Sequence, residues 1–382
     1  MSKINDLIKK LCPNGVEFKK IIDIAEVGTG SSNRQDAVED GVYPFYVRSK
    51  EVFRINKFEY NEEAIIIPGE GGIGEIFHYV NGKYALHQRA YRIHIVDNRM
   101  RTKFLYYYMF NSFKDFIMLK AVNATVTSIR KPMIEQFSVP IPPIEVQEEI
   151  VRILDKFGEL EAKLEAELEV RKSQYEFWRE KLLNNKKYSV VSLGDYATFS
   201  QGIQVDPKDQ KDYCDDGMVP FLRIVDFVKD DEPPRYIIKP DNKYIKKENK
   251  EMVMIRYGAS AAGKVFINKF GAIANNMFKI NLITNEIDIK YLWHYLSQDK
   301  IYKSLNNTGG GSTMPAINFK IASSIKVVLP PKEEQNRIVK ILDEFDKLVN
   351  NISIGLPAEI ELRRQQYEYY RNKLLNFEVL NG

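Results

Sequence analysis

The sequence is poor in the residues on which metal, disulfide and acid–base chemistry depend. Its 382 residues include only two cysteines, Cys12 and Cys214, and four histidines. The cysteines lie in different halves of the chain without a CxxC pair, which argues against a disulfide framework or a zinc site and fits a reducing compartment. The histidines form no HExxH motif and have no carboxylate at ligand spacing, so structural roles are favoured over catalysis for them.

Long hydrophobic runs and a strong excess of one charge are also missing. No run of about 18 apolar residues occurs, and the start MSKINDLIKKLCPNG has no hydrophobic signal core, so we expect a cytoplasmic protein. The 56 Lys and Arg against 52 Asp and Glu give a net charge of +4. A protein that holds DNA alone through many phosphates is usually more basic. Any nucleic-acid role should therefore share its electrostatics with partners or confine them to one face.

Most of one stretch of the sequence is present twice. The first copy reads VPIPPIEVQEEIVRILDKF from residue 139, and the second reads VVLPPKEEQNRIVKILDEF from residue 327. Matching tails follow, RKSQYEFWREKLLN at 171–184 and RRQQYEYYRNKLLN at 363–376. The polar pairs Gln147/Gln335 and Asp155/Asp343 agree as well as the apolar positions. Shared core positions alone would not produce those matches, so the pattern indicates a duplication.

Each copy predicts a long amphipathic helix. Apolar residues recur at steps of three and four, and the first helix, from about 145 to 184, would be roughly 60 Å long. Gly355 and Pro357 predict a break or kink in the second helix near residues 353–356. Helices of this length usually pack on a partner helix. The alternative is that each apolar stripe packs on its own domain.

The segments between the helices repeat a second pattern. Residues 1–143 predict a mixed α/β domain with strands at 51–55, 63–68 and 91–96 and an aromatic helix at 102–120. The next segment echoes this order, with Gly30 aligned to Gly202 and Gly69 to Gly258.

The predicted organisation is therefore domain 1–143, helix 144–188, domain 189–331 and helix 332–382. A compact second domain must join the end of one long helix to the start of the other, which favours an antiparallel pair. We expect an α+β fold in which two duplicated mixed α/β domains are separated by two long helices, paired as an antiparallel coiled coil with pseudo-twofold symmetry.

The proline pairs, the ILD-F helices, the Leu-led tetrads at 160–168, the RRQQYEYYRNKLL tail and the duplicated domain starts resemble the specificity subunit of type I restriction-modification enzymes. The resemblance covers essentially the whole chain. It implies that each domain is a target recognition domain that reads one half of a bipartite, asymmetric site in double-stranded DNA. It also implies that the helices set the spacer and bind two methyltransferase subunits, and that two restriction subunits join the complex. S-adenosylmethionine, ATP and magnesium are then expected on the partners, with no catalytic or metal-binding residue in this chain.

Two other hypotheses stay open. The chain could be the specificity chain of a fused methyltransferase-nuclease system, or a coiled-coil scaffold that binds no DNA. Catalytic motifs give little support to an enzyme. GEGGIG at 69–74 is followed by a strand-like EIFHYV, whereas a dinucleotide loop opens a helix. DEPPRY at 231–236 departs from the amino-methyltransferase motif it resembles and favours a surface turn.

Candidate contacts come from polar, basic and glycine-rich loops, because such side chains read base edges and bind phosphates. In the first domain the DNA-binding candidates are Ser31, Asn33, Arg34, Arg48, Lys50, Gln88, Arg89, Thr127 and Arg130. In the second domain they are Gln201, Gln204, Arg223, Arg256, Tyr257, Ser260, Asn276, Ser312 and Thr313. Aromatic residues of the repeated tails predict a surface covered by a partner, or shared between the two helices: Tyr175, Phe177, Trp178, Tyr367, Tyr369 and Tyr370.

A change of helix length tests this division of labour. Inserting one Leu-led four-residue unit within residues 160–168 lengthens the helix by about 6 Å. We expect a longer unread gap between two unchanged half-sites, measured by mapping the methylated DNA motif. A change in either half-site sequence would contradict the separation of spacer and reader.

Overall fold

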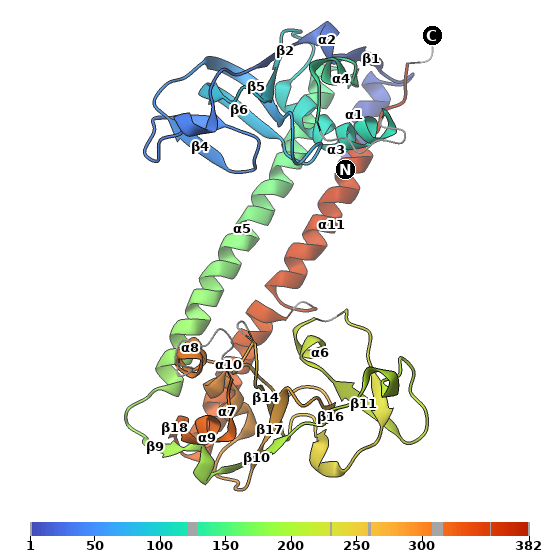
Figure 1. Ribbon diagram of the computed structural model, residues 1–382. Helices are drawn as coiled ribbons and strands as arrows, with labels where there is room; N and C mark the ends of the chain where they lie inside the picture. Colours follow the sequence, from blue (N-terminus) through green and yellow to red (C-terminus); the bar gives the residue numbers. More distant parts are fainter. Residues whose placement is uncertain are drawn as a thin grey trace. The chain divides into compact units, whose positions relative to one another are not determined.

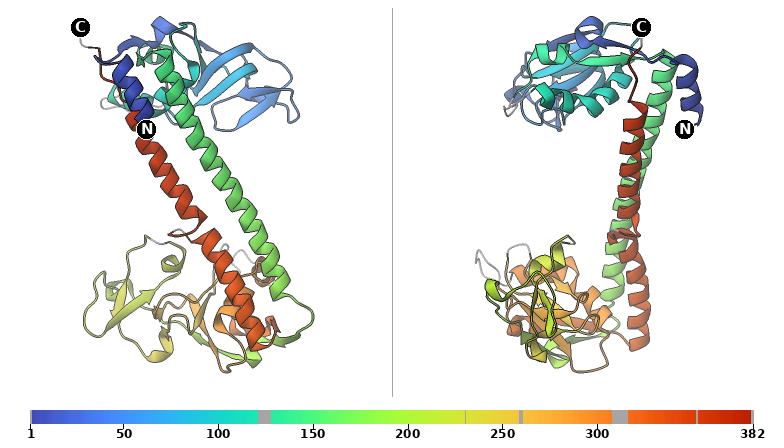
Figure 2. Two further views of the ribbon diagram at one scale, coloured as in Figure 1. Left: turned by 180° about the vertical axis from the view of Figure 1, so that it is seen from behind. Right: turned by 90° about the vertical axis from the view of Figure 1, so that its right-hand side faces the viewer.

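The computed structural model describes residues 2–120, 128–229, 231–258, 261–307, 316–351 and 353–380 (Figure 1). Its contacts divide the chain into two compact units, residues 1–165 with 359–382 and residues 166–358. The division falls inside the helices instead of at their ends, because each unit keeps the helix segments that pack on its own sheet. Both termini belong to the first unit (Figure 2), where Leu380 N–H donates to the Val16 carbonyl at 2.9 Å.

The first unit is built on a six-stranded sheet in the order β2-β7-β5-β6-β3-β4, antiparallel except for the β3–β6 pair. Its strands are β2 Ala25–Thr29, β3 Tyr43–Tyr46, β4 Val52–Ile55, β5 Tyr60–Pro68, β6 His78–Leu86 and β7 Ala90–Ile95. A separate pair joins β1 Glu17–Lys20 to β8 Ser138–Ile141. The helices are α1 Ser2–Leu11, α2 Ile21–Ile24, α3 Thr102–Lys120 and α4 Lys131–Glu135, with a 3-10 turn at Arg34–Asp36. The three predicted strands are β4, β5 and β7, and the predicted aromatic helix is α3.

The core of the first unit lies between this sheet and the helices. Phe104, Met109 and Phe113 of α3 are fully buried with Ile65 and Ile93 of the sheet. Helix α3 therefore forms because its apolar residues return to one face, although its other face also carries aromatic residues.

The second unit repeats the topology with shorter strands. The order β10-β17-β14-β15 reproduces β2-β7-β5-β6, and the parallel pair β11–β16 reproduces β3–β6. The strands are β9 Ser189–Ser192, β10 Ala197–Gln201, β11 Met218–Leu222, β12 Tyr236–Ile238, β13 Ile245–Lys246, β14 Met252–Ile255, β15 Val265–Phe266, β16 Gly271–Ile273, β17 Met277–Leu282 and β18 Lys326–Leu329. The helices are α6 Ile224–Val228, α7 Ile289–Leu296, α8 Asp299–Asn307 and α9 Phe319–Ser324, and short 3-10 turns lie at Leu193–Asp195, Pro207–Asp209 and Asn242–Tyr244.

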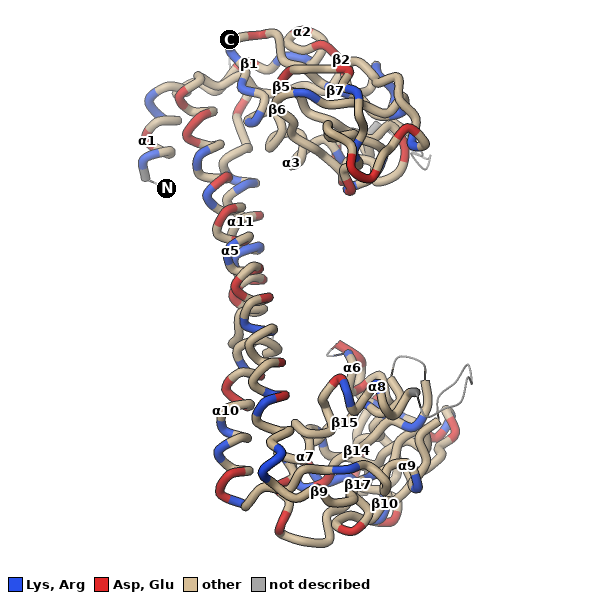
Figure 3. The backbone as a smooth tube through the Cα atoms, turned by 90° about the vertical axis from the view of Figure 1, so that its left-hand side faces the viewer, with Lys and Arg blue, Asp and Glu red and all other residues tan. Residues whose placement is uncertain are grey.

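Three long helices follow the predicted pattern. They are α5 Ile144–Leu183, α10 Lys332–Asn350 and α11 Leu356–Leu374. The break predicted near residues 353–356 is the segment between α10 and α11, where Gly355 approaches the Lys347 carbonyl too closely for a Cβ atom. Lys and Arg alternate with Asp and Glu along α5 and α11 (Figure 3). None of the helices in the described ranges is long and apolar enough to cross a membrane.

Both predicted packing modes of the long helices occur. The first turns pack on the domain core, as Ile150 and Leu154 of α5 show in the first unit. Further along, Phe157 of α5 packs on Tyr367 and Tyr370 of α11, with ring centroids 6.0 and 5.7 Å apart. Arg364 of α11 pairs with Glu161 and Glu165 of α5, both at 2.6 Å. Later residues of α5 thus meet earlier residues of α11, which makes this helix pair antiparallel.

A duplicated glutamine joins each helix to its domain. Gln147 is fully buried; its Oε1 accepts from Arg101 N–H at 2.8 Å and its Nε2 donates to the carbonyls of Arg99 and Pro142, both at 2.7 Å. Gln335 makes the equivalent bonds to Asp288 N–H, the Glu286 carbonyl and the Pro330 carbonyl at 2.7, 2.7 and 2.8 Å. One buried side chain therefore satisfies three backbone groups in each unit, one of them fully buried.

A duplicated aspartate adds an ionic link between α10 and α7. Asp343 accepts from Lys290 at 2.7 Å and from His294 at 2.9 Å. Partial burial raises the pKa of Asp343, but the hydrogen bonds from His294 and Lys290 outweigh it and lower this pKa to about 2. In the first unit, Asp155 has Lys103 and Tyr107 in the same positions, at 2.8 and 2.6 Å.

Replacing either glutamine should destabilise its own unit. Gln147→Ala and Gln335→Ala each leave buried backbone groups without partners, which should cost about 2 to 4 kcal/mol of unfolding free energy. Urea denaturation measures the free energy of unfolding, and limited proteolysis shows which of the two units has lost stability. Gln136→Ala, at an exposed position, should change the free energy by less than about 0.5 kcal/mol. Equal losses in all three variants would refute the assigned role.

Candidate nucleic-acid interface

In the first unit, four segments from distant parts of the chain meet at the end of the sheet where β2 terminates. Ser32 N–H donates to the Leu86 carbonyl at 3.2 Å, and Gln88 N–H donates back to the Ser32 carbonyl at 3.0 Å. Gly69 N–H then donates to the Arg89 carbonyl at 2.8 Å, and Ile129 N–H to the Gly69 carbonyl at 2.7 Å. Residues 30–34, 69–70, 87–89 and 128–130 form what we call the first loop surface.

The second unit contains the equivalents of three of these four hydrogen bonds. Ile203 N–H donates to the Ile273 carbonyl at 2.8 Å, Arg256 N–H to the Asn276 carbonyl at 2.9 Å, and Ile317 N–H to the Arg256 carbonyl at 2.9 Å. Residues 202–204, 256–257, 274–276 and 316–317 form the second loop surface. The two ladders define which positions are equivalent.

Glycine allows the first segment of each ladder to approach its neighbour. A Cβ atom on Gly30 would lie 1.8 Å from the Leu86 carbonyl oxygen, and one on Gly202 would lie 2.1 Å from the Ala274 carbonyl oxygen. Any side chain would push the loop away. The predicted match of Gly30 with Gly202 therefore has a structural reason.

The predicted match of Gly69 with Gly258 is wrong. The ladder aligns Gly69 with Arg256, since both donate to the carbonyl of the equivalent residue, Arg89 or Asn276. His78 pairs with Ile66, 12 residues before it, whereas the equivalent Phe266 pairs with Val253, 13 residues before it. Matching glycines across turns of unequal length shifted the alignment.

An arginine pair shares one carboxylate in the first loop surface. Glu70 accepts from Arg48 at 2.8 Å and from Arg89 at 3.1 Å. The hydrogen bond from Arg89 is the main cause that lowers the pKa of Glu70. Burial, together with the charges of Arg48 and Arg89, lowers the pKa of His87, so its imidazole is neutral at pH 7 and its Nδ1 accepts from Arg89 N–H at 3.0 Å. Two guanidinium groups are thus held on one exposed face.

Each surface also contains a pair of carboxamides. Gln88 Nε2 donates to Asn33 Oδ1 at 2.6 Å, and Asn275 Nδ2 donates to Gln204 Oε1 at 3.3 Å. Gln88 and Gln204 are exposed, and their partners are half-buried.

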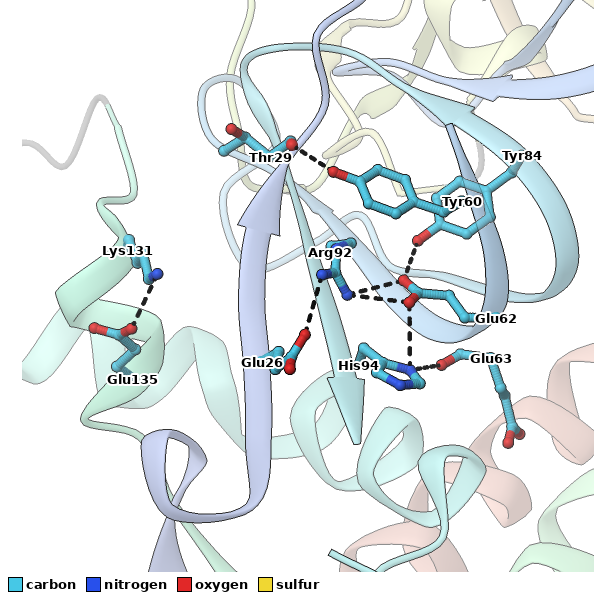
Figure 4. A network of polar contacts seen from close by, with 10 residues as sticks. All are labelled: Glu26, Thr29, Tyr60, Glu62, Glu63, Tyr84, Arg92, His94, Lys131 and Glu135. Carbon is cyan, nitrogen blue, oxygen red and sulfur yellow. Dashed lines mark hydrogen bonds and ion pairs between the residues drawn. The ribbon is translucent and has the colours of Figure 1, made fainter. Parts of the chain in front are cut away.

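A network of polar side chains from neighbouring strands of the sheet holds β2, the strand that leads into the first loop surface (Figure 4). Tyr60 donates to the Thr29 carbonyl at 2.8 Å, at the last residue of β2. Arg92 lies over the Tyr60 ring and donates to Glu62 at 3.0 Å. Burial and the hydrogen bond to Glu62 raise the pKa of Tyr84, which therefore stays protonated and donates to Glu62.

The ion pairs of this network extend across neighbouring strands. Arg92 of β7 also reaches Glu26 of β2 at 3.3 Å, and His94 Nδ1 lies 2.9 Å from the Glu63 carbonyl of β5 (Figure 4). At the loop itself, Glu59 accepts from the backbone and hydroxyl of Ser31 and from the hydroxyl of Ser32.

The structure brings most of the predicted first-domain residues together. Asn33, Gln88 and Arg89 lie on the first loop surface, and Arg48 joins it through Glu70. Arg130 is exposed beside Ile129 at the start of α4. The remaining described candidates are all exposed: Ser31 on Glu59, Arg34 over the Phe53 ring, and Lys50.

In the second domain, Gln204, Arg256, Tyr257 and Asn276 lie on the second loop surface, and exposed Gln201 ends β10. Arg256 Nε and Asn276 Oδ1 are buried without a hydrogen-bond partner in the part of the chain that the structure describes. Thr127, Ser260, Ser312 and Thr313 lie outside the described residues.

Arg223 lies apart from the second loop surface. Its guanidinium donates to Asp226 at 2.7 Å and to the Pro233 carbonyl at 3.0 Å, and pairs with Glu232 at 3.3 Å. With its side chain only 22% exposed, it holds the neighbouring turn together, and its contact with DNA stays a prediction. The DEPPRY stretch is that turn, which leads into β12, and GEGGIG leads into strand β6.

The aromatic candidates separate into two groups. Tyr175 is only 4% exposed and stacks on Phe345, and Tyr367 and Tyr370 pack on Phe157. These three are shared between helices, which is the second of the two roles expected for them. The exposed group consists of Phe177, Trp178 and Tyr369, at 59%, 38% and 61%.

Sequence reasoning missed three residues of these surfaces. Glu70 was hidden within a glycine-rich loop, His87 has no motif, and Asn275 was passed over for its neighbour Asn276. Only the pairing of segments that are distant in the chain shows that these residues lie on the loop surfaces. Among the described residues, no group of three or more His, Cys, Asp or Glu side chains could hold a metal ion.

Comparisons with known proteins agree over nearly the whole chain. The family model described as "Type I restriction modification DNA specificity domain" matches residues 13–170 and 185–362. The specificity subunit of a type I restriction enzyme of Escherichia coli is 32% identical over 74% of this chain and 72% of its own length. A predicted type I restriction enzyme specificity subunit of Haemophilus influenzae is 30% identical over 97% of this chain and 98% of its own length.

Solved structures share the fold. The S subunit of a type I restriction-modification system from M. genitalium has a TM-score of 0.61 at 16% identity, covering 94% of this chain and 96% of that one. A chain from a study of type I complex assembly and conformational transition has a TM-score of 0.59 at 14% identity, covering 95% and 98%. The fold of two repeated α+β domains is confirmed.

Neutralising Glu70 should change the salt dependence of DNA binding. Glu70→Gln releases Arg48 and Arg89 toward phosphates, so the slope of log K against log salt should steepen by about one. Titrations of labelled duplex at several salt concentrations measure it.

Glu17→Gln is the matched control, because Glu17 also pairs with an arginine, Arg99 at 3.4 Å, but near the opposite end of the sheet. It should leave the slope unchanged. Equal slopes for wild type and Glu70→Gln would show that this arginine pair does not contact DNA.

Proposed function

The chain belongs to the type I restriction-modification DNA specificity family, and from that premise we propose that it is the DNA-specificity subunit of a type I restriction-modification complex. Each recognition domain reads one half of a bipartite, asymmetric site in double-stranded DNA. The chain itself carries out no chemistry, and the reactions take place on its partners.

One observation carries this proposal: two backbone ladders that share three equivalent hydrogen bonds present different side chains at equivalent positions. Arg89 of the first loop surface is replaced by Asn276 in the second, and Gly69 by Arg256. Arginine suits guanine, whose O6 and N7 both accept, whereas asparagine suits adenine. The same frame with different readers is what two unlike half-sites require.

The loops also suit the chemistry of a duplex. The first loop surface and Arg48 offer guanidinium groups, carboxamides and backbone N–H groups from segments that one sheet holds in place. Phosphate contacts fix register, and base-edge contacts supply sequence preference. With a net charge of only +4, much of the phosphate binding falls to partner subunits.

We place the partners on the long helices. Phe177 of α5 and Tyr369 of α11 occupy equivalent positions of the duplicated tails and are both exposed. Lys181 and Lys373, also equivalent, lie over the rings of Phe177 and Tyr369 at 5.7 and 6.0 Å. A surface that occurs twice fits one partner bound twice, which supports two methyltransferase subunits.

In the assembled complex two restriction subunits join, and the helices set the unread spacer. S-adenosylmethionine, ATP and magnesium are assigned to the partner subunits, and the complex works in the cytoplasm.

The test is to co-express this chain with its neighbouring methyltransferase in cells without DNA methylation and to sequence the genome with detection of modified bases. We expect one split motif that carries N6-methyladenine and that disappears when this chain is omitted. Methylation at a motif that does not depend on this chain would refute the proposal and favour the scaffold hypothesis.

A further inference from the structure

The carboxamide pair is a side-chain contact that both loop surfaces keep while their neighbouring residues differ. In the first surface it joins Asn33 to Gln88, and in the second it joins Gln204 to Asn275. The backbone contacts make the two pairs equivalent. Ser32, next to Asn33, forms a parallel β-bridge with His87, and Ile203, next to Gln204, forms a parallel β-bridge with Ala274. Asparagine and glutamine have exchanged places between the two pairs, so chemistry has been kept although residue identity has not.

The residues around the pair show no such agreement. The position after Gln88 is Arg89 in the first surface, and the position after Asn275 is Asn276 in the second. Glu70 forms an antiparallel β-bridge with Ser128. At the equivalent position of the second surface, Tyr257 forms an antiparallel β-bridge with Ala316. The residues that flank the pair therefore differ between the two surfaces in charge and in size.

A hydrogen-bonded pair of carboxamides presents a defined pattern to a ligand. One NH2 group and one carbonyl are used in the shared bond, which leaves one carbonyl and one NH2 group for an outside partner. This count holds for either orientation of the two amides, because reversing both only exchanges which residue donates. The outward pattern is one donor beside one acceptor.

Among the four bases, adenine matches that pattern in the major groove. Adenine offers N7 as acceptor and N6–H as donor, whereas guanine offers two acceptors and would face the outward carbonyl with its O6. Cytosine offers a donor and thymine an acceptor, so each satisfies only one of the two amide groups. The mutual hydrogen bond also fixes both side chains before DNA arrives, which reduces the entropy lost on binding.

The pairs are placed to meet a ligand. Gln88 and Gln204 are exposed, and Gly30 and Gly202 bring the partner loop against the end of the neighbouring strand. In the second surface, Arg256 Nε and Asn276 Oδ1 lie beside the pair, buried and without partners within the described residues. Buried polar groups of this kind are usually satisfied, so these two atoms point to a ligand at this surface.

We propose that each carboxamide pair is a specificity-determining element that reads one adenine in its half-site, Asn33 with Gln88 in the first domain and Gln204 with Asn275 in the second. This rests on the proposed function and adds the base that each domain reads at its common position. The flanking residues, which differ between the surfaces, then distinguish the two half-sites.

The experiment uses the complex of this chain with its methyltransferase and a set of duplexes in which every base pair of the motif is replaced in turn. Wild type should discriminate against other bases at one A·T pair in each half-site by roughly 5- to 150-fold. Gln88→Ala should reduce that preference to near one at a single position of the first half-site. Asn275→Ala should do the same in the second half-site, with each variant leaving the other half-site unchanged.

A modified base tests the same contact from the DNA side. Replacing that adenine by 7-deazaadenine removes the N7 acceptor, so it should weaken binding by wild type severalfold and have little effect on the matching alanine variant. Should an alanine variant fold poorly, Gln88→Glu and Asn275→Asp keep the side-chain shape. Both offer only acceptors and should shift the preference toward cytosine.

Asn98→Ala and Asn285→Ala are the controls. Both are exposed asparagines, near the ends of β7 and β17 that lie away from the loop surfaces. They should leave every base preference unchanged. If Gln88→Ala weakened binding to all duplexes equally, or left the motif unaltered, the inference would be overturned. The pair would then only hold its two loops together. Failure of the proposed function looks different, because wild type itself would then show no base preference.

Discussion

Both loop surfaces depend on a backbone approach that leaves no space for a side chain. At Gly30 and Gly202 the chain leaves its strand and passes directly against a carbonyl of the neighbouring strand end. That contact begins the ladder of hydrogen bonds through which four distant segments reach one surface. Without it, the residues that present functional groups would remain on separate loops. The constraint is steric, so it tolerates wide variation in the residues that follow.

This arrangement explains how a duplicated protein can read two different sequences. The ladders use main-chain atoms, which every residue supplies, and they leave the side chains free to change. Arg89 and Asn276 occupy equivalent positions of the two ladders, and so do Gly69 and Arg256. Behind the first loop surface, polar contacts such as the hydrogen bond from Tyr60 to the Thr29 carbonyl hold the end of β2 in place. Stability and specificity therefore rest on separate atoms, and a change of target need not weaken the fold.

The long helices follow the same division. Gln147 and Gln335 join helix to domain through backbone groups, and Asp155 and Asp343 add side-chain links whose partners have diverged from Tyr107 to His294. These polar positions explain why the repeat extends beyond the apolar pattern in the sequence. A surface helix needs only its apolar period, whereas a residue with three fixed hydrogen-bond partners has few substitutes.

The sequence by itself determined the duplication, the long helices, the break near Gly355, and three strands and the aromatic helix of the first domain. These features depend on periodicity and on local backbone chemistry, which neighbouring residues define. It also led to candidate DNA contacts, which stay predictions.

Only the tertiary structure decided which of those side chains meet. Glu70 joins Arg48 to Arg89, Asn33 meets Gln88 across 55 residues, and Arg223 turns toward Asp226. The glycine match at Gly69 failed for the same reason that the carboxamide pairs were not seen. Strand register and turn length set which residues lie opposite one another, and both follow from pairing between segments far apart in the chain.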